Sequence, residues 1–208
     1  VIVATCDDAI ASVIRGFGGK VIMTANNHKN VTTRVAEAIE KIDCTHVILL
    51  QGDEPLLLPR HVDAFLGAIL KNPDGHAWNA TGPIEVNDDL DRHSFVKCVV
   101  GQNNRILFCF RRSPFFSPPE SQQRFVKKIL GLIAFKKQFL LDLTKLPPTE
   151  IEKAESIEQM RILDNGFEFG AVPLSTSLPS VNEPHEAGDV FELMHSDKEQ
   201  KQLLNKIL

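Results

Sequence analysis

The chain has 208 residues, of which 24% are charged and 43% hydrophobic, and its formal net charge is -4. This composition is that of a globular protein and excludes a disordered or fibrous chain. The mild acidity argues against a protein that binds nucleic acid without sequence preference. No apolar run approaches the roughly 20 residues of a membrane span. We therefore predict one compact cytoplasmic domain over residues 1–208.

Residues 1–70 repeat a strand and a helix three times. Ile10, Val13, Ile14 and Phe17 recur at helical spacing and predict one apolar helix face, which Gly18 ends. This alternation is typical of a parallel sheet with helices on both faces. The predicted strands are Val1–Thr5, Lys20–Thr24 and His46–Leu50, and the predicted helices are Ile10–Phe17, Arg34–Ile42 and Pro59–Ile69.

The middle of the chain changes character, because two apolar runs are joined by a turn-rich segment that indicates an antiparallel hairpin. These runs are Phe95–Val100 and Ile106–Phe110. After them we predict strands at Leu130–Phe135 and Phe167–Pro173, helices at Lys136–Leu146 and Thr149–Asn165, and two helices within Glu186–Leu208. The predicted fold class is α/β: a three-layer α/β/α domain with a mostly parallel, Rossmann-like sheet and an antiparallel β-rich insertion in the middle.

The four cysteines, Cys6, Cys44, Cys98 and Cys109, include no C-x-x-C pair. Three of them stand inside apolar runs, where a thiol behaves as a small buried hydrophobic group. We interpret all four as reduced and structural, in preference to a redox or zinc role.

The segment Gln51-Gly52-Asp53-Glu54-Pro55 directly follows the apolar strand His46–Leu50. Open α/β sheets bind their ligands at the carboxyl ends of such strands. The Asp53 carboxylate offers hard oxygen atoms of the kind that Mg²⁺ prefers. From position alone a second interpretation stays open, in which Asp53 or Glu54 only caps the next helix.

This five-residue segment resembles a signature of the 3-deoxy-manno-octulosonate cytidylyltransferases, which make CMP-Kdo for lipopolysaccharide. The resemblance extends in collinear order over nearly the whole chain and implies a fold of the nucleotide-diphospho-sugar transferase type. It is carried by Val1–Thr5 with the following Asp pair, Gly18 to Thr24, His28 to Arg34, Phe95-Val96-Lys97, Arg111, Leu130-Gly131, and Ile157 to Leu163 followed by Gly166.

The resemblance implies a role for individual residues. Asp53 and Arg111 would be catalytic, and Mg²⁺ would be held by Asp53 with Asn182. The side chains expected against CTP are Thr24, His28, Asn30, Thr32, Arg34 and Gln51. Those expected against an acidic keto-sugar are Arg111, Glu155, Glu158 and Gln159. The resemblance also implies a homodimer, for which we predict a surface within Phe95–Phe135.

Three departures from the family pattern bear on activity. The family's glycine- and lysine-bearing phosphate loop and first strand do not occur in these residues, so we expect an N-terminally truncated or inactive chain with unpaired apolar strands that aggregates. Asn182 stands where the family has an aspartate. The family's sugar-facing His and Tyr read Ile129 and Ile133, and its Ser-Gly before Thr32 reads Asn30-Val31, which favours a less hydroxylated acid.

The implied reaction joins a 2-keto sugar acid to CTP and releases pyrophosphate. Two alternatives stay open. One is another transferase of the same architecture, either a cytidylyltransferase for a nonulosonic acid or a nucleotide-sugar glycosyltransferase. The other is a non-catalytic homologue that binds a nucleotide or a sugar acid, which Asn182 and the missing loop favour.

Overall fold

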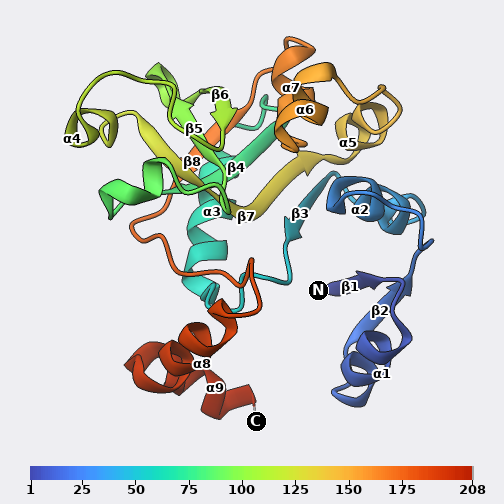
Figure 1. Ribbon diagram of the computed structural model, residues 1–208. Helices are drawn as coiled ribbons and strands as arrows, with labels where there is room; N and C mark the ends of the chain where they lie inside the picture. Colours follow the sequence, from blue (N-terminus) through green and yellow to red (C-terminus); the bar gives the residue numbers. More distant parts are fainter. Residues whose placement is uncertain (208) are drawn as a thin grey trace.

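The computed structural model describes residues 1–207, which form a six-stranded sheet, a separate two-stranded sheet and the helices around them (Figure 1). The strands are β1 Ile2–Thr5, β2 Lys20–Met23, β3 His46–Leu50, β4 Ala77–Gly82, β5 Lys97–Val100, β6 Ile106–Phe110, β7 Val126–Lys136 and β8 Gly170–Pro173. The α-helices are α1 Asp8–Gly16, α2 Val31–Ile39, α3 Pro59–Lys71, α4 Pro119–Gln122, α5 Lys137–Leu143, α6 Glu150–Glu155, α7 Met160–Asp164, α8 Glu186–Ser196 and α9 Lys198–Ile207. Short 3₁₀ turns lie at η1 Asn87–Leu90 and η2 Gln102–Asn104. Among these helices of residues 1–207, none has the length and apolarity that a membrane span requires.

The six-stranded sheet is organised around β7, its longest strand. One edge of β7 pairs with β5 near its start and with β3 near its end, and the other edge pairs with β4. Strands β3, β4, β5 and β8 run in one direction, and β6 and β7 run in the other. The α/β class is therefore confirmed, with a sheet of mixed direction.

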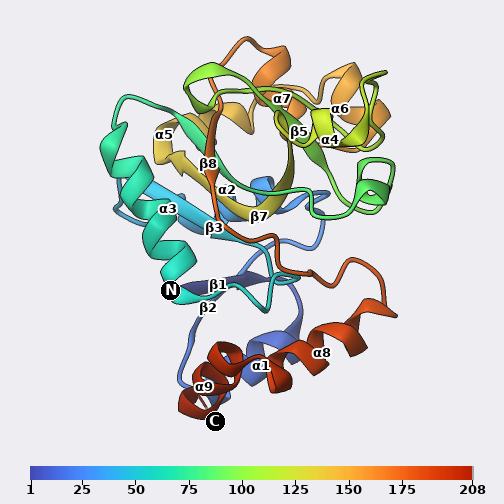
Figure 2. The same ribbon diagram turned by 90° about the vertical axis from the view of Figure 1, so that its left-hand side faces the viewer.

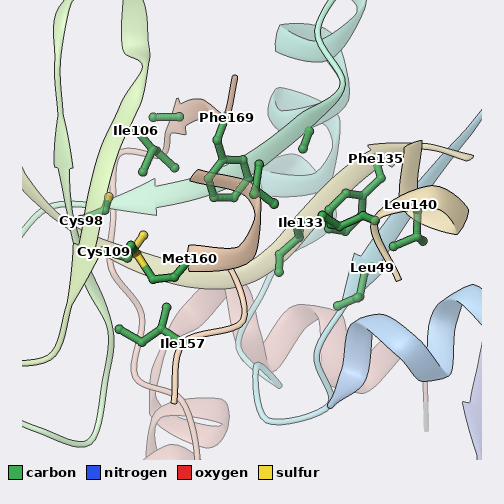
Figure 3. Packing of buried hydrophobic residues seen from close by; sticks show 14 of the residues in the cluster. Leu49, Cys98, Ile106, Cys109, Ile133, Phe135, Leu140, Ile157, Met160 and Phe169 are labelled. Carbon is green, nitrogen blue, oxygen red and sulfur yellow. The ribbon is translucent and has the colours of Figure 1, made fainter. Parts of the chain in front are cut away.

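Helices cover both faces of this sheet, because the side chains of β7 alternate between them. Ile133 and Phe135 point into a core shared with α2, α5 and α7, part of which is shown in Figure 3. Leu132 and Ala134 point to the opposite face, where α3 packs. Figure 2 shows α3 lying along that face. The three-layer arrangement follows from this alternation.

The two-stranded sheet is a distinct unit. Strands β1 and β2 pair in parallel, and within residues 1–207 neither is hydrogen-bonded to a strand of the larger sheet. Helix α1 packs on this pair through the buried Ala11. Ile10, Val13 and Phe17 stand on the predicted apolar helix face, and these side chains are 49%, 58% and 72% exposed. Within residues 1–207, this face of α1 therefore stays largely exposed.

Two sequence predictions need correction. The predicted helix Thr149–Asn165 is two helices, α6 and α7, because Ser156 adopts a left-handed conformation with φ 54° and turns the chain between them. Strand β4 was not predicted at all, although it lies between β7 and β8. By contrast, the hairpin is confirmed as β5 and β6, and the tail as α8 and α9.

Candidate active site

The loop Gln51–Pro55 is fastened to β7 at Gly131. The Gln51 amide donates to the Gly131 carbonyl at 2.8 Å, and the Gly131 amide donates to Glu54 Oε1 at 2.7 Å. A Cβ atom at Gly131 would lie only 2.7 Å from Glu54 Cγ and 2.8 Å from Gln51 Oε1. Glycine at this position therefore lets the loop lie directly on the strand.

A cleft of about 700 Å³ opens beside this loop. Its other walls are β7 near Ile129, the turn between α6 and α7, and the segment that precedes α8. A neighbouring hollow of about 470 Å³ continues from it. The two share Asp53, Ser94, Arg111, Ser156 and Asn182. The end of β3 thus lies at a large cleft, as expected for the carboxyl end of a strand in an α/β sheet.

Asp53 lines both hollows, and its Oδ1 atom is buried without a hydrogen-bond partner in residues 1–207. Burial raises the pKa of the carboxyl group, and the nearby positive charge of Lys128 opposes this effect. The main-chain carbonyl of Asp53 accepts a hydrogen bond from the Val181 amide at 2.9 Å, which ties the loop to the segment carrying Asn182. A bound cation would give the buried Asp53 oxygen an electrostatic partner and would favour the ionised carboxylate.

Asn182 lies across the same cleft, with its amide nitrogen donating to Ser180 Oγ at 3.0 Å. Its main-chain amide donates to Glu186 Oε2 at 2.7 Å, which fixes the segment. No group of three His, Cys, Asp or Glu side chains in the described chain is placed to hold a metal ion. Mg²⁺ needs only one or two carboxylates when substrate phosphates and water complete its shell, so the buried Asp53 oxygen fits this ion.

The turn between α6 and α7 brings Glu158 and Gln159 to the cleft. Glu158 Oε2 is buried without a partner in residues 1–207. Burial raises the pKa of Glu158, and the hydroxyl and amide of Thr32 oppose this effect. Glu152 is bound instead in a buried ion pair, where Arg161 Nε and Nη2 donate to its two carboxylate oxygens at 2.7 and 2.5 Å. This pair holds α6 and α7 together.

Arg111 lies at the end of β6 and points into both hollows. Three of its hydrogen bonds go to main-chain carbonyls, at 2.9 Å to Glu155, 2.9 Å to His93 and 3.1 Å to Ser156. The guanidinium group thereby stabilises the left-handed turn at Ser156. A guanidinium has five N–H donors, so two remain for a ligand.

Comparison with known proteins identifies the chain. The family described as "Cytidylyltransferase" matches residues 1–169. The 3-deoxy-manno-octulosonate cytidylyltransferase of Geobacter sulfurreducens is 34% identical over 203 residues, which is 92% of this chain and 81% of that protein. The enzyme of the same name from Escherichia coli is 32% identical over 88% of this chain and 73% of its own length. The chain belongs to the cytidylyltransferase family.

A solved structure agrees with this membership. The structure of a CMP:2-keto-3-deoxy-manno-octonic acid synthetase complexed with CTP superimposes with a TM-score of 0.86 at 31% identity, covering 95% of this chain and 81% of that one. The inositol-1-phosphate CTP transferase from T. maritima, at 17% identity and a TM-score of 0.61, is similar in fold alone. The predicted family is confirmed.

In this cytidylyltransferase, the residues predicted to face the nucleotide divide into two groups. Gln51 and Asn30 line the large cleft. Thr24, His28 and Arg34 do not, because they hydrogen-bond around the connection between β2 and α2. Arg34 Nη1 donates to Thr24 Oγ1 at 2.6 Å, and His28 contacts Thr33 and the Glu37 carboxylate. Thr32 is buried beside Glu158 in a small void.

The predicted sugar-side residues divide in the same way. Glu158 and Gln159 line the large cleft, and Glu155 lines the adjoining hollow. Ile129 lines the cleft as expected. Ile133 does not, because it is 1% exposed and packs in the hydrophobic core between β7 and helices α2, α5 and α7. The apolar change at Ile133 therefore affects packing rather than the wall of the large cleft.

Two cleft residues of this cytidylyltransferase were not assigned a role from the sequence. Phe95 and Lys128 both line the cleft and both are buried. The alternation of the strand was a usable signal, since Lys128 shares a face with the apolar Leu130 and Leu132 rather than pointing to solvent with Lys127.

Proposed function

We propose that this cytidylyltransferase activates a 2-keto-3-deoxy sugar acid of the 3-deoxy-manno-octulosonate class with CTP, giving a CMP-sugar and pyrophosphate. The supporting observation is the unpartnered Asp53 oxygen in a large cleft, in a chain whose relatives are named for this reaction. The anomeric hydroxyl would attack the α-phosphorus of CTP. A new bond forms between the sugar oxygen and the α-phosphorus, and the bond from the α-phosphorus to the bridging oxygen breaks. Pyrophosphate leaves with that oxygen, and the hydroxyl proton passes to water.

The protein's task in this reaction is positioning and charge neutralisation, because phosphoryl-type transfer requires no protein nucleophile. Arg111 would use its two remaining N–H groups on the carboxylate of the acid. Glu155, Glu158 and Gln159 would accept or donate hydrogen bonds to sugar hydroxyls. Asn30 and Gln51 would contact the nucleotide from the opposite side of the cleft.

Asp53 would hold a Mg²⁺ ion, and the side-chain carbonyl of Asn182 would contribute a neutral oxygen. Such an ion neutralises negative charge on phosphate oxygens. The observation that supports this site is the buried and unpartnered Asp53 oxygen, whose carboxyl pKa burial raises. A single charged ligand predicts weaker metal binding than two carboxylates would give.

The test measures pyrophosphate release and CMP-sugar formation with Mg²⁺, all four nucleoside triphosphates and a panel of keto-sugar acids. We expect CTP with a 3-deoxy acid to be used best. Asp53→Asn should lower kcat by roughly 100-fold or more, because an electrostatic contact to the transition state is lost. Asp63→Asn, a matched change at an exposed residue of α3, should leave kcat unchanged. An Asp53→Asn variant within about tenfold of wild type would contradict the role.

A second candidate function is a homologue that binds nucleotide or sugar acid without turnover, and Asn182 favours it because an amide brings no charge to the metal. The same assay separates the two. Saturable CTP binding by calorimetry with no pyrophosphate from any acid would support the second candidate. Restoring a carboxylate with Asn182→Asp would then be the informative variant.

We also infer a homodimer that associates through residues 95–135. Leu107 of β6 and Phe116 of the following loop are 53% and 106% exposed in this region, which supports an apolar contact surface. Light scattering after size-exclusion chromatography should give twice the chain mass, and Leu107→Lys combined with Phe116→Lys should give a monomer. A wild-type monomer at micromolar concentration would contradict the inference. The cytoplasmic location stays a prediction.

A further inference from the structure

Two lysines of neighbouring strands contact one phenylalanine ring. Lys97 of β5 and Lys128 of β7 are directly paired across the sheet. Their ammonium nitrogens lie 5.0 and 4.7 Å from the centre of the Phe95 ring, close enough for cation–π attraction. Both lysines are therefore buried and both contact Phe95. They differ in the other groups that surround each ammonium nitrogen.

The ammonium group of Lys97 has a close hydrogen-bond acceptor inside the protein. The side chain is fully buried, and Nζ donates to the Arg92 carbonyl at 2.5 Å. It lines neither the large cleft nor the hollows next to it. This contact ties Lys97 to the connection between η1 and β5, where its side chain is shielded from solvent.

The ammonium group of Lys128 is buried but lacks a close hydrogen-bond acceptor or ion-pair partner in the part of the chain that the structure describes. Lys128 is 8% exposed, and its one hydrogen-bond acceptor in residues 1–207 is the Leu178 carbonyl at 3.5 Å, the outer limit for such a bond. No carboxylate of the described chain lies within ion-pair distance of it. An ammonium group has three N–H donors, and a buried charge without partners is costly.

Lys128 also lies on the wall of two cavities. One is the large cleft that contains Asp53, and the other is a pocket of about 260 Å³ that Phe95 also lines. Glu54 is near enough to favour the charged lysine, but its Oε1 atom already accepts from Gly131. The partner that Lys128 lacks is therefore an anion, and the open space beside it is the substrate cleft.

We propose that Lys128 binds an oxyanion of a substrate, either a phosphate of the nucleotide or the carboxylate of the sugar acid, in the cleft beside Asp53. This proposal rests on the proposed function and extends it by one specificity-determining residue. An oxyanion would supply a charge-assisted partner for the ammonium group and lie within the same cleft as the Asp53 carboxylate. The Phe95 ring excludes water from one side of the contact, which strengthens it.

The experiment compares Lys128→Met, Lys128→Arg and Lys97→Met with wild type. It measures KM and kcat for CTP and for the acid, and separately the binding of pyrophosphate and of 3-deoxy-manno-octulosonate alone by calorimetry. Lys128→Met should weaken the ligand that Lys128 contacts by roughly 10- to 100-fold, the usual range for a hydrogen bond to a charged group. Lys128→Arg should recover most of this loss. Lys97→Met should bind both ligands as wild type does.

The pattern of losses identifies the oxyanion. Weaker pyrophosphate binding with a raised KM for CTP assigns Lys128 to a phosphate, and weaker binding of the acid assigns it to the carboxylate. A folded Lys128→Met variant that binds both ligands within twofold of wild type overturns the proposal. If wild type makes no CMP-sugar but Lys128→Met still loses pyrophosphate or acid binding, the proposed function fails while the Lys128 site stands.

Discussion

The two sheets of this protein are built from the same kind of strand and helix but are covered differently. In the six-stranded sheet, Phe65 and Ile69 of α3 are 0% and 4% exposed against the apolar face of β7 and β4. In the β1–α1–β2 unit, Val13 and Phe17 are 58% and 72% exposed. Helical periodicity is equally clear in both helices, so it predicts which side chains share a face and not whether another element covers it.

This difference has an energetic meaning. Removing apolar surface from water gives roughly 25 cal/mol per Å², so the covered face of α3 contributes more to folding than the exposed face of α1. Ile2 of β1 and Met23 of β2 are also 42% and 40% exposed, so this unit leaves several apolar side chains in contact with water. Four variants, two in each region, sharpen the comparison.

The largest expected effect is in the covered region. Phe65→Ala should lower the free energy of unfolding by about 3–5 kcal/mol, because it leaves a cavity between α3 and the sheet. Phe17→Ala, the same change on α1, should alter it by less than about 0.5 kcal/mol. Urea denaturation followed by circular dichroism measures both. Equal losses for the two variants would contradict the distinction between a covered and an uncovered face.

The smaller effect concerns pH. Burial lowers the pKa of Lys97 to about 8. Above this value the folded chain has released a proton that the unfolded chain, with an ordinary lysine, keeps until about pH 10.4. The free energy of unfolding should therefore rise with pH between about 8 and 10, by at most about 1.4 kcal/mol per pH unit.

The control for this prediction comes from the uncovered region. Lys97→Met should remove the rise, whereas Lys20→Met, at an exposed position of β2, should keep it. Denaturation curves at several pH values between 7.5 and 10 give the slope for each variant. An unchanged slope in Lys97→Met would show that another group titrates.

Much of the fold could be predicted from local pattern, and the failures have physical causes. Strand β3 and helix α3 were found because their apolar spacing is strong. Strand β4, Ala77–Gly82, was missed because Ala-Trp-Asn-Ala-Thr-Gly has little β-branched character, and its conformation depends on pairing with β7 and β8 on both sides. The break at Ser156 has no Gly or Pro to signal it. It is held instead by contacts distant in sequence, namely the Glu152–Arg161 ion pair and the hydrogen bonds from Arg111 to the Glu155 and Ser156 carbonyls.

Site residues could be predicted from the sequence where they directly follow a strand. They could not be predicted where their position depends on contacts with residues distant in the sequence. Asp53 was found because it directly follows β3. The cleft position of Lys128 depends on Phe95 and Leu178, which come from other parts of the chain. The roles of Thr24, His28 and Arg34 stay predictions, since these side chains hydrogen-bond among their own neighbours.

The central position of β7 has a consequence for how the chain folds. His46 pairs with Lys136, and Ala77 pairs with Phe135. Strands β3 and β4 can therefore pair with β7 only after the long segment that separates them from β7 has been synthesised. During synthesis, these earlier strands must remain unpaired until β7 leaves the ribosome. We therefore expect slow folding governed by contacts distant in sequence, with the active-site loop, which lies on Gly131 of that strand, among the last parts to form.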